Sequence, residues 1–105
     1  MEHSYRKLSF REAKELLDSE DACFFDVREE DEYVTGHADG AALFPLGSID
    51  EDSAAEAIPD PDTPVLVYCR SGARSFQAAM KLIGYGYRRV YDLGGLNGWP
   101  YGISW

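Results

Sequence analysis

The chain has 105 residues, a length that suits one compact domain. Hydrophobic residues make up 45 % and charged residues 28 %, a composition that excludes a disordered chain. Nineteen acidic residues against ten basic ones give a net charge of −9, which argues against a nucleic-acid partner. We therefore expect a single domain over residues 1–105.

Neither a membrane span nor a secretion signal is expected. No apolar run approaches the roughly 20 residues that a transmembrane helix needs, and residues 1–6 lack the apolar core of a signal peptide. A cytoplasmic location is therefore predicted, with Cys23 and Cys69 as reduced thiols. Because His3 and His37 are isolated and neither cysteine has a ligand at metal-site spacing, no metal is expected.

The first elements along the chain are a helix and a strand. Ser9 is followed three residues later by Glu12, the pattern of a capping box at the start of a helix. Apolar residues then recur on one helical face, and polar residues over 18–21 end the helix; this face carries Phe10, Ala13 and Leu17. The next segment, 22–27, is a short apolar run typical of a buried strand.

The middle of the chain has weaker signals. Residues 29–34 resemble a short acidic helical turn closed by Gly36, and residues 41–44 form a second candidate strand. Residues 48–57 predict a weak helix, after which three prolines over 58–64 indicate a loop. We expect this region to connect stronger elements on either side.

The second half has the clearest pattern. Residues 65–68 form a continuous apolar strand, followed by a loop over 69–74. A helix is then predicted from about Ser75 to Ile83, because its apolar residues recur at helical spacing. A last strand over 89–93 leads into a glycine-rich segment over 94–99. Strands that alternate with helices predict an α/β fold whose central parallel sheet is flanked by helices on both faces.

The carboxyl edge of such a sheet is the expected site. Ligands of parallel α/β folds bind where the strands end, and three strand ends bear polar or glycine-rich sequence: Asp26–Arg28, Cys69 and Asp92–Gly94. We therefore predict that these segments lie together. Residues 63–105 hold five basic residues and one acidic residue, so an anion is expected here and not near the acidic first half.

Cys69 is the predicted nucleophile. It leaves a strand in a short loop that opens onto a helix, an arrangement in which loop amides and the helix N-terminus favour an anion. Gly72 allows the backbone to turn sharply. A thiol in this position is expected to have a lowered pKa. Arg70 and Arg74 would add positive potential, and we expect Arg74 to lie in an exposed loop.

Three ordered motifs resemble the rhodanese (thiosulfate sulfurtransferase) family. The active-site loop of this family resembles Cys69-Arg70-Ser71-Gly72-Ala73-Arg74-Ser75. Its N-terminal signature resembles Asp26-Val27-Arg28-Glu29 with Gly36-His37 and Gly40-Ala41. Its C-terminal signature resembles Leu93-Gly94-Gly95-Leu96 with Trp99. The resemblance spans about residues 8–100. The chain departs from the family at Ala38-Asp39, where members often have Ile-Pro.

The resemblance implies a single rhodanese-like domain with sulfurtransferase activity. Cys69 would take a sulfur from a small anionic donor such as thiosulfate, hold it as a persulfide, and pass it to cyanide or to a thiol of a small molecule or protein. No cofactor is implied. Substrate-binding residues would be Arg70, Ser71, Gly72, Ala73, Arg74 and Ser75, with amides of 70–74 stabilising the anion, while Asp26 and Arg28 would support the site as an ion pair.

Three alternatives stay open at this point. Phosphatases and arsenate reductases of the same fold have a loop one residue longer, with arginine where this chain has Ser75. Disulfide chemistry between Cys23 and Cys69 would need Cα atoms within ~7 Å, whereas roughly five residues at ~3.3 Å each separate them along a parallel sheet. The chain is also consistent with a sulfur-relay or regulatory module whose acidic half docks a partner protein.

Overall fold

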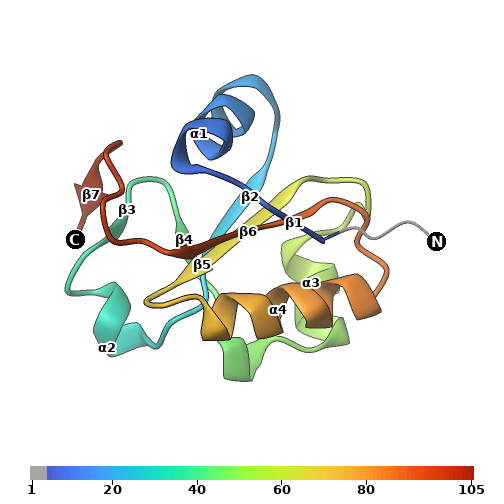
Figure 1. Cartoon of the computed structure of the whole chain (residues 1–105). Coiled ribbons are helices and arrows are strands. Elements are labelled where there is room, and N and C mark those ends of the chain that lie inside the picture. The colour runs from blue at the N-terminus through green and yellow to red at the C-terminus, as the bar shows by residue number, and fades with distance from the viewer. Residues whose placement is uncertain (1–4) are drawn as a thin grey trace.

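A computed structural model describes residues 5–105. His3 and the first residues, on which the expectation of no signal peptide rested, lie outside this range. The centre of the fold is a parallel sheet with strand order β1-β6-β5-β2-β4 (Figure 1). Its strands are β1 (Tyr5–Lys7), β2 (Cys23–Asp26), β4 (Ala42–Leu43), β5 (Val65–Cys69) and β6 (Val90–Gly95).

Helices cover both faces of this sheet, as the sequence predicts (Figure 1). Helix α1 (Phe10–Ser19) lies on one face, and α3 (Glu51–Ala57) and α4 (Ala73–Gly84) lie on the other. The short helix α2 (Glu30–Tyr33) follows β2, and a 3₁₀ turn η1 (Leu46–Ser48) precedes α3. The expected α/β architecture is thus confirmed.

The two faces bury separate apolar clusters because side chains alternate along each strand. On the α4 face, Phe25, Val67 and Cys69 pack with Ala79 and Leu82 of the helix. On the α1 face, a second cluster contains Ala13, Phe24, Leu66, Tyr68 and Trp99. Cys69 therefore has its side chain on the α4 face.

The predicted start of α1 is confirmed in detail. The amide of Glu12 donates to Ser9 Oγ at 3.1 Å, and the amide of Ser9 donates to Glu12 Oε1 at 2.9 Å. These two bonds satisfy amides that have no partner within the helix. Ala13 is fully buried against the sheet, as expected for the apolar face.

Several elements differ from the sequence prediction. Helix α4 begins at Ala73 and not at Ser75, and β6 continues to Gly95, two residues beyond the predicted end. Strand β1 was not expected, because three polar residues have no apolar pattern; it forms by pairing its backbone with β6. Two further short strands, β3 (His37–Ala38) and β7 (Ile103–Ser104), also form only by pairing with each other.

Strand β7 and the residue before it support the turn at Ala38-Asp39, where members of the family often have Ile-Pro. The amide of Asp39 donates to the Gly102 carbonyl at 3.0 Å, and Ser104 Oγ donates to the Asp39 carboxylate at 2.7 Å. The amide of Ala38 donates to Tyr68 Oη at 3.0 Å. The turn is thus fixed by partners distant in sequence and does not need proline.

Candidate active site

The three predicted strand ends lie together at the carboxyl edge of the sheet. Asp26 pairs with Tyr68 in neighbouring strands, and Cys69 pairs with Gly95 in the next. This confirms that the segments 26–28, 69 and 92–94 share one edge. Parallel strands all end at the same edge of a sheet, so the prediction required only that the strands be parallel.

The sulfur of Cys69 is surrounded by hydrogen-bond donors from its own loop. The amide of Gly72 lies 3.0 Å from Sγ and the amide of Ser75 lies 3.3 Å from it. Ser75 Oγ is 3.5 Å from the same sulfur, and both side chains are buried. Gly72 and Ser75 belong to the start of α4, so the sulfur occupies the position of a helix N-terminal anion.

Backbone conformation and close packing shape this loop. Gly72 has φ +103°, a left-handed conformation that a residue with a side chain adopts only with strain. On the other side, a Cβ atom on Gly95 would lie 2.5 Å from the Arg70 carbonyl oxygen. Strand β6 therefore approaches the loop so closely that only glycine fits at residue 95, which gives the Leu93-Gly94-Gly95 motif a physical reason.

The environment of Cys69 lowers the pKa of its thiol. Burial is the largest influence and raises the pKa, but hydrogen bonds from the Ser75 hydroxyl and from the amides of Ser75, Gly72 and Ser71 outweigh it. The predicted direction is thus confirmed. The amides that donate to the sulfur are those of Ser71, Gly72 and Ser75. The sequence predicted amides within 70–74, so two of the three belong to the expected set and the amide of Ser75 lies one residue beyond it. A lowered pKa increases the thiolate fraction at neutral pH.

Replacing Ser75 with alanine should raise the pKa of Cys69, because it removes the hydroxyl nearest the sulfur and leaves the amides in place. A net hydrogen bond contributes about 0.5–1.5 kcal/mol, so alkylation of Cys69 by iodoacetamide at pH 7 should slow by about three- to tenfold. The pH profile of that rate should move to higher pH. An unmoved profile would show that the backbone amides alone set the thiol pKa.

The two loop arginines are not equivalent. Arg74 lies in the first turn of α4, and its guanidinium contacts both carboxylate oxygens of Glu32, at 2.6 Å and 3.0 Å. The expectation that Arg74 sits in an exposed loop is therefore wrong: α4 starts early and α2 supplies a partner. Arg70 is 76 % exposed, and its Nε lies 4.0 Å from a carboxylate oxygen of Glu32, so Glu32 holds it more loosely than Arg74.

Glu32 restrains Arg74, and we expect Glu32→Gln to release it. The variant should lower the KM for an anionic sulfur donor about two- to fivefold, the effect of removing one like charge about 4 Å or more away in water. The hydrogen bond from Arg74 holds the pKa of Glu32 at about 2, so the pair stabilises the folded state at neutral pH.

This stability should be lost as the pH falls from the ordinary glutamate value through about 2. At pH 7 the variant should therefore be less stable by up to about 1 kcal/mol, and near pH 2 it should match the parent. Urea denaturation at several pH values measures the difference. A deficit that persists at pH 2 would contradict the assignment to this ion pair.

Asp26 and Arg28 form a network on the other face of the sheet from Cys69. The Asp26 side chain alternates with that of Phe25 and joins Tyr68, whose hydroxyl donates to it at 2.7 Å. Arg28 donates to both Asp26 oxygens and to the Gly36 carbonyl. These contacts join β2, β5 and the turn after α2, so the pair supports the site edge without touching the sulfur.

Cys23 lies at the opposite end of the sheet. It is paired with Val65, and Cys69 is four positions further along β5, or about 13 Å at 3.3 Å per residue. Both cysteines are free thiols, and burial raises the pKa of Cys23. The geometry excludes a disulfide between them, which removes this alternative.

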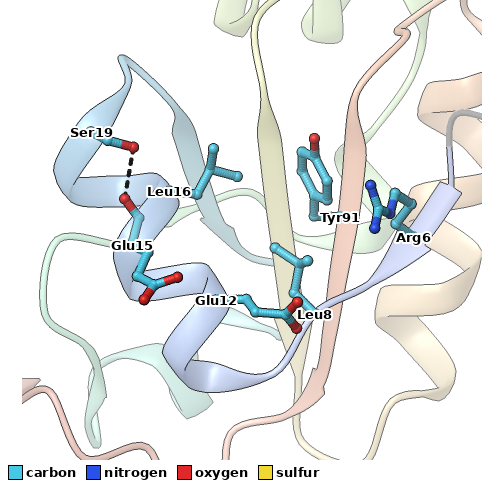
Figure 2. A pocket seen from close by; sticks show the side chains of 7 residues that line it. All are labelled: Arg6, Leu8, Glu12, Glu15, Leu16, Ser19 and Tyr91. Carbon is cyan, nitrogen blue, oxygen red and sulfur yellow. Dashed lines mark hydrogen bonds between the residues drawn. The ribbon is translucent and has the colours of Figure 1, made fainter.

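A surface groove of about 310 Å³ lies between α1 and β1 (Figure 2). Leu8, Leu16 and Tyr91 line it and belong to the cluster on the α1 face, so the groove is separated from Cys69 by the sheet. Within residues 5–105, no group of three or more His, Cys, Asp or Glu side chains is arranged to hold a metal ion. Over the same range, no helix is long and apolar enough to cross a bilayer.

Sequence reasoning missed residues that approach the loop from elsewhere. Glu32 was read as one of several acids on a short helix, yet it is the partner of Arg74. Gly95 belongs to the predicted C-terminal motif, but only the structure shows that its close approach to the Arg70 carbonyl requires a glycine there. Lys7 carried no signal, because β1 itself was not expected. Each position depends on contacts between distant segments.

A buried cysteine of lowered pKa, held by amides at a strand-to-helix junction of a parallel α/β sheet, is the arrangement expected of an enzyme that transfers a group through a cysteine. The rhodanese-like domain model matches residues 9–100. The chain belongs to the rhodanese family, and the names of its relatives support sulfurtransferase activity.

The relatives and structural neighbours match over most of their length. Thiosulfate sulfurtransferase GlpE of Coxiella burnetii is 35 % identical over 96 residues, which cover 90 % of this chain and 87 % of the relative. Thiosulfate sulfurtransferase PspE of Escherichia coli is 40 % identical over 74 residues, 70 % of each protein. A solved E. coli rhodanese with anions superposes with TM-score 0.74 and 33 % identity, covering 80 % and 98 % of the two chains. The Staphylococcus saprophyticus protein SSP1007 gives TM-score 0.76 and 26 % identity, covering 94 % and 98 %.

Proposed function

We propose that this enzyme moves a sulfane sulfur from thiosulfate to a thiophilic acceptor through a persulfide on Cys69. The observation that carries the proposal is the pair of amides, of Gly72 and Ser75, that donate to Cys69 Sγ at the start of α4. Such preorganised donors favour a sulfur anion, whether it is the attacking thiolate or the persulfide that replaces it. One cysteine is enough for this cycle.

In the first step, the Cys69 thiolate attacks the outer sulfur of thiosulfate. A bond forms between Cys69 Sγ and that sulfur, the bond between the two thiosulfate sulfurs breaks, and its electron pair leaves with sulfite. In the second step, cyanide or a thiolate attacks the outer sulfur of the persulfide. The Cys69 sulfur recovers the bonding pair as thiolate, and thiocyanate or a new persulfide is released. No net proton, oxidant or reductant is required.

The charge around the loop supports an anionic donor. Arg70 is exposed beside the loop, and Arg74 lies at the start of α4. Two relatives are named thiosulfate sulfurtransferases, and a solved neighbour is described as holding anions. The acceptor is proposed by chemical class only, as cyanide or a thiol of a small molecule or protein. Cytoplasmic location stays a prediction.

The loop length favours sulfur transfer over phosphate or arsenate chemistry. The sulfur takes amides from Gly72 and Ser75, and the arginine of the loop is residue 74, held against Glu32. A guanidinium in this position points to α2 and not over the sulfur, where it would have to lie to hold a tetrahedral oxyanion transferred to the cysteine.

Intact-protein mass tests the proposal directly. Incubation with thiosulfate should add the mass of one sulfur atom, and later addition of cyanide should remove it. Peptide mapping should place the sulfur on Cys69. A protein that stays folded with a free thiol but gains no sulfur from thiosulfate would contradict the proposed donor; phosphatase and arsenate reductase assays on the same sample would then test the other loop chemistry.

A further inference from the structure

Lys7, the last residue of β1, lies on the same face of the sheet as Cys69. Tyr5, two residues earlier, packs its ring against Phe76 of α4 with centroids 5.6 Å apart, and its hydroxyl donates to Asp92 at 2.9 Å. Side chains two residues apart on a strand share a face. The Lys7 side chain therefore leaves the strand toward the α4 side.

The ammonium of Lys7 lies beside Gly94 of β6, the strand that borders the cysteine loop. Its Nζ lies 3.3 Å from the position that a Cβ atom would take on Gly94. The Cα of Gly94 in turn lies 3.6 Å from the corresponding position on Gly72, the residue whose amide donates to Cys69 Sγ. Gly94 therefore lies between the Lys7 ammonium and Gly72 of the cysteine loop.

This charge is less compensated than that of Arg74. Among residues 5–105, no carboxylate oxygen lies within 4.0 Å of Lys7 Nζ, whereas Arg74 makes two hydrogen bonds with Glu32. Asp92, the residue paired with Lys7 in the sheet, instead accepts from Tyr5 Oη and from the Gly94 amide. Lys7 is an exposed residue, so its charge is available to ions that approach this edge of the sheet.

We propose that Lys7 is a recognition residue of the sulfur-donor site, where its charge favours anionic over neutral reagents at Cys69. For the natural donor this role rests on the proposed function, because thiosulfate is the anion in question. The effect on the cysteine itself does not depend on it. Lys7 acts through its charge and not by bonding to the reacting sulfur.

Alkylation of Cys69 measures this preference without any sulfur transfer. In a Cys23→Ser background only Cys69 reacts, and its thiolate displaces iodide from the methylene carbon of either iodoacetate, which is anionic, or iodoacetamide, which is neutral. The ratio of the two rate constants reports the potential at the sulfur, because changes in thiol pKa affect both reagents alike. Lys7→Gln, Lys7→Arg and Lys14→Gln are compared with the parent; Lys14 is an exposed lysine of α1, on the opposite face.

The ratio of iodoacetate to iodoacetamide rates should fall about twofold in Lys7→Gln, the effect of one charge at about 10 Å in water. Lys7→Arg should keep the parent ratio, and Lys14→Gln, with the same change in net charge, should also keep it. Added salt should reduce the parent ratio toward that of Lys7→Gln. An equal ratio in Lys7→Gln and the parent, with equal melting temperatures, would overturn the proposal.

Steady-state kinetics then test the consequence for the donor. With cyanide as acceptor, Lys7→Gln should raise the thiosulfate KM by a similar factor and leave kcat within about twofold. A parent protein that shows the alkylation preference but takes no sulfur from thiosulfate would refute the proposed donor and keep Lys7 as a charge sensor of the loop. A parent that transfers sulfur with a KM unaffected by Lys7→Gln would refute the role of Lys7 alone.

Discussion

Cys69→Ala should abolish sulfur transfer, whereas Cys23→Ser should keep it within about twofold of the parent. The first change removes the sulfur atom that accepts hydrogen bonds from the amides of Gly72 and Ser75 and that acts as nucleophile in the proposed mechanism. The second removes a thiol at the other end of the sheet, whose pKa burial raises. Loss of a nucleophile commonly reduces turnover by several orders of magnitude, about 10⁴-fold or more.

Thiocyanate production from thiosulfate and cyanide measures the difference, and the melting temperature of each variant shows whether it folds. Because Cys69 is nearly fully buried and alanine leaves a small void, Cys69→Ser provides a second inactive variant of closer volume. Comparable loss in Cys23→Ser, with the fold intact, would contradict a mechanism that uses one cysteine.

Asp26→Ala should destabilise the fold by about 3–5 kcal/mol, because it leaves the Arg28 charge and the Tyr68 hydroxyl without their shared partner. The Asp26 side chain is fully buried and that of Arg28 is 11 % exposed, so water cannot replace the lost contacts. For a domain of this size, the melting temperature should fall by about 15 °C or more. Urea denaturation gives the free energy of unfolding for comparison.

Tyr68→Phe is the matched control, since it keeps the ion pair and removes only the hydroxyl, which donates to Asp26 and accepts from the Ala38 amide. With two hydrogen bonds lost, we expect it to cost about 1–3 kcal/mol. If Asp26→Ala were no more destabilising than Tyr68→Phe, the buried ion pair would contribute little to the fold. If Asp26→Ala lost activity well below its melting temperature, the network would also be needed to hold the site edge.

The two predictions separate chemistry from support at one sheet edge. Residues 26 and 69 both end strands there, but strand alternation places their side chains on opposite faces. Cys69 turns toward α4, whose first amides hold its sulfur, while Asp26 turns toward Tyr68. The same parallel sheet thus provides the proposed reaction site on one face and its structural support on the other.

The architecture and the candidate nucleophile could both be predicted from the sequence alone. Strands and helices with strong local patterns predicted the alternation that makes a parallel sheet, and parallel strands place their carboxyl ends together whatever the remaining packing. The segment from Cys69 to Ser75 contains the candidate nucleophile, the turn at Gly72 and the start of α4. Because these three features are close together in the chain, a local pattern was enough to predict them. The capping box at Ser9 was likewise local and was confirmed.

The distribution of charge around the Cys69 sulfur depends on contacts that form only in the folded chain. Arg74 is bound because α2 places Glu32 against it, and Lys7 lies beside Gly94 because β1 pairs with β6. Gly95 is required because β6 touches the Arg70 carbonyl. Helical and strand periodicity report which face of one element is buried, but not which distant side chain meets it, so long-range contacts between polar residues leave no local pattern to read.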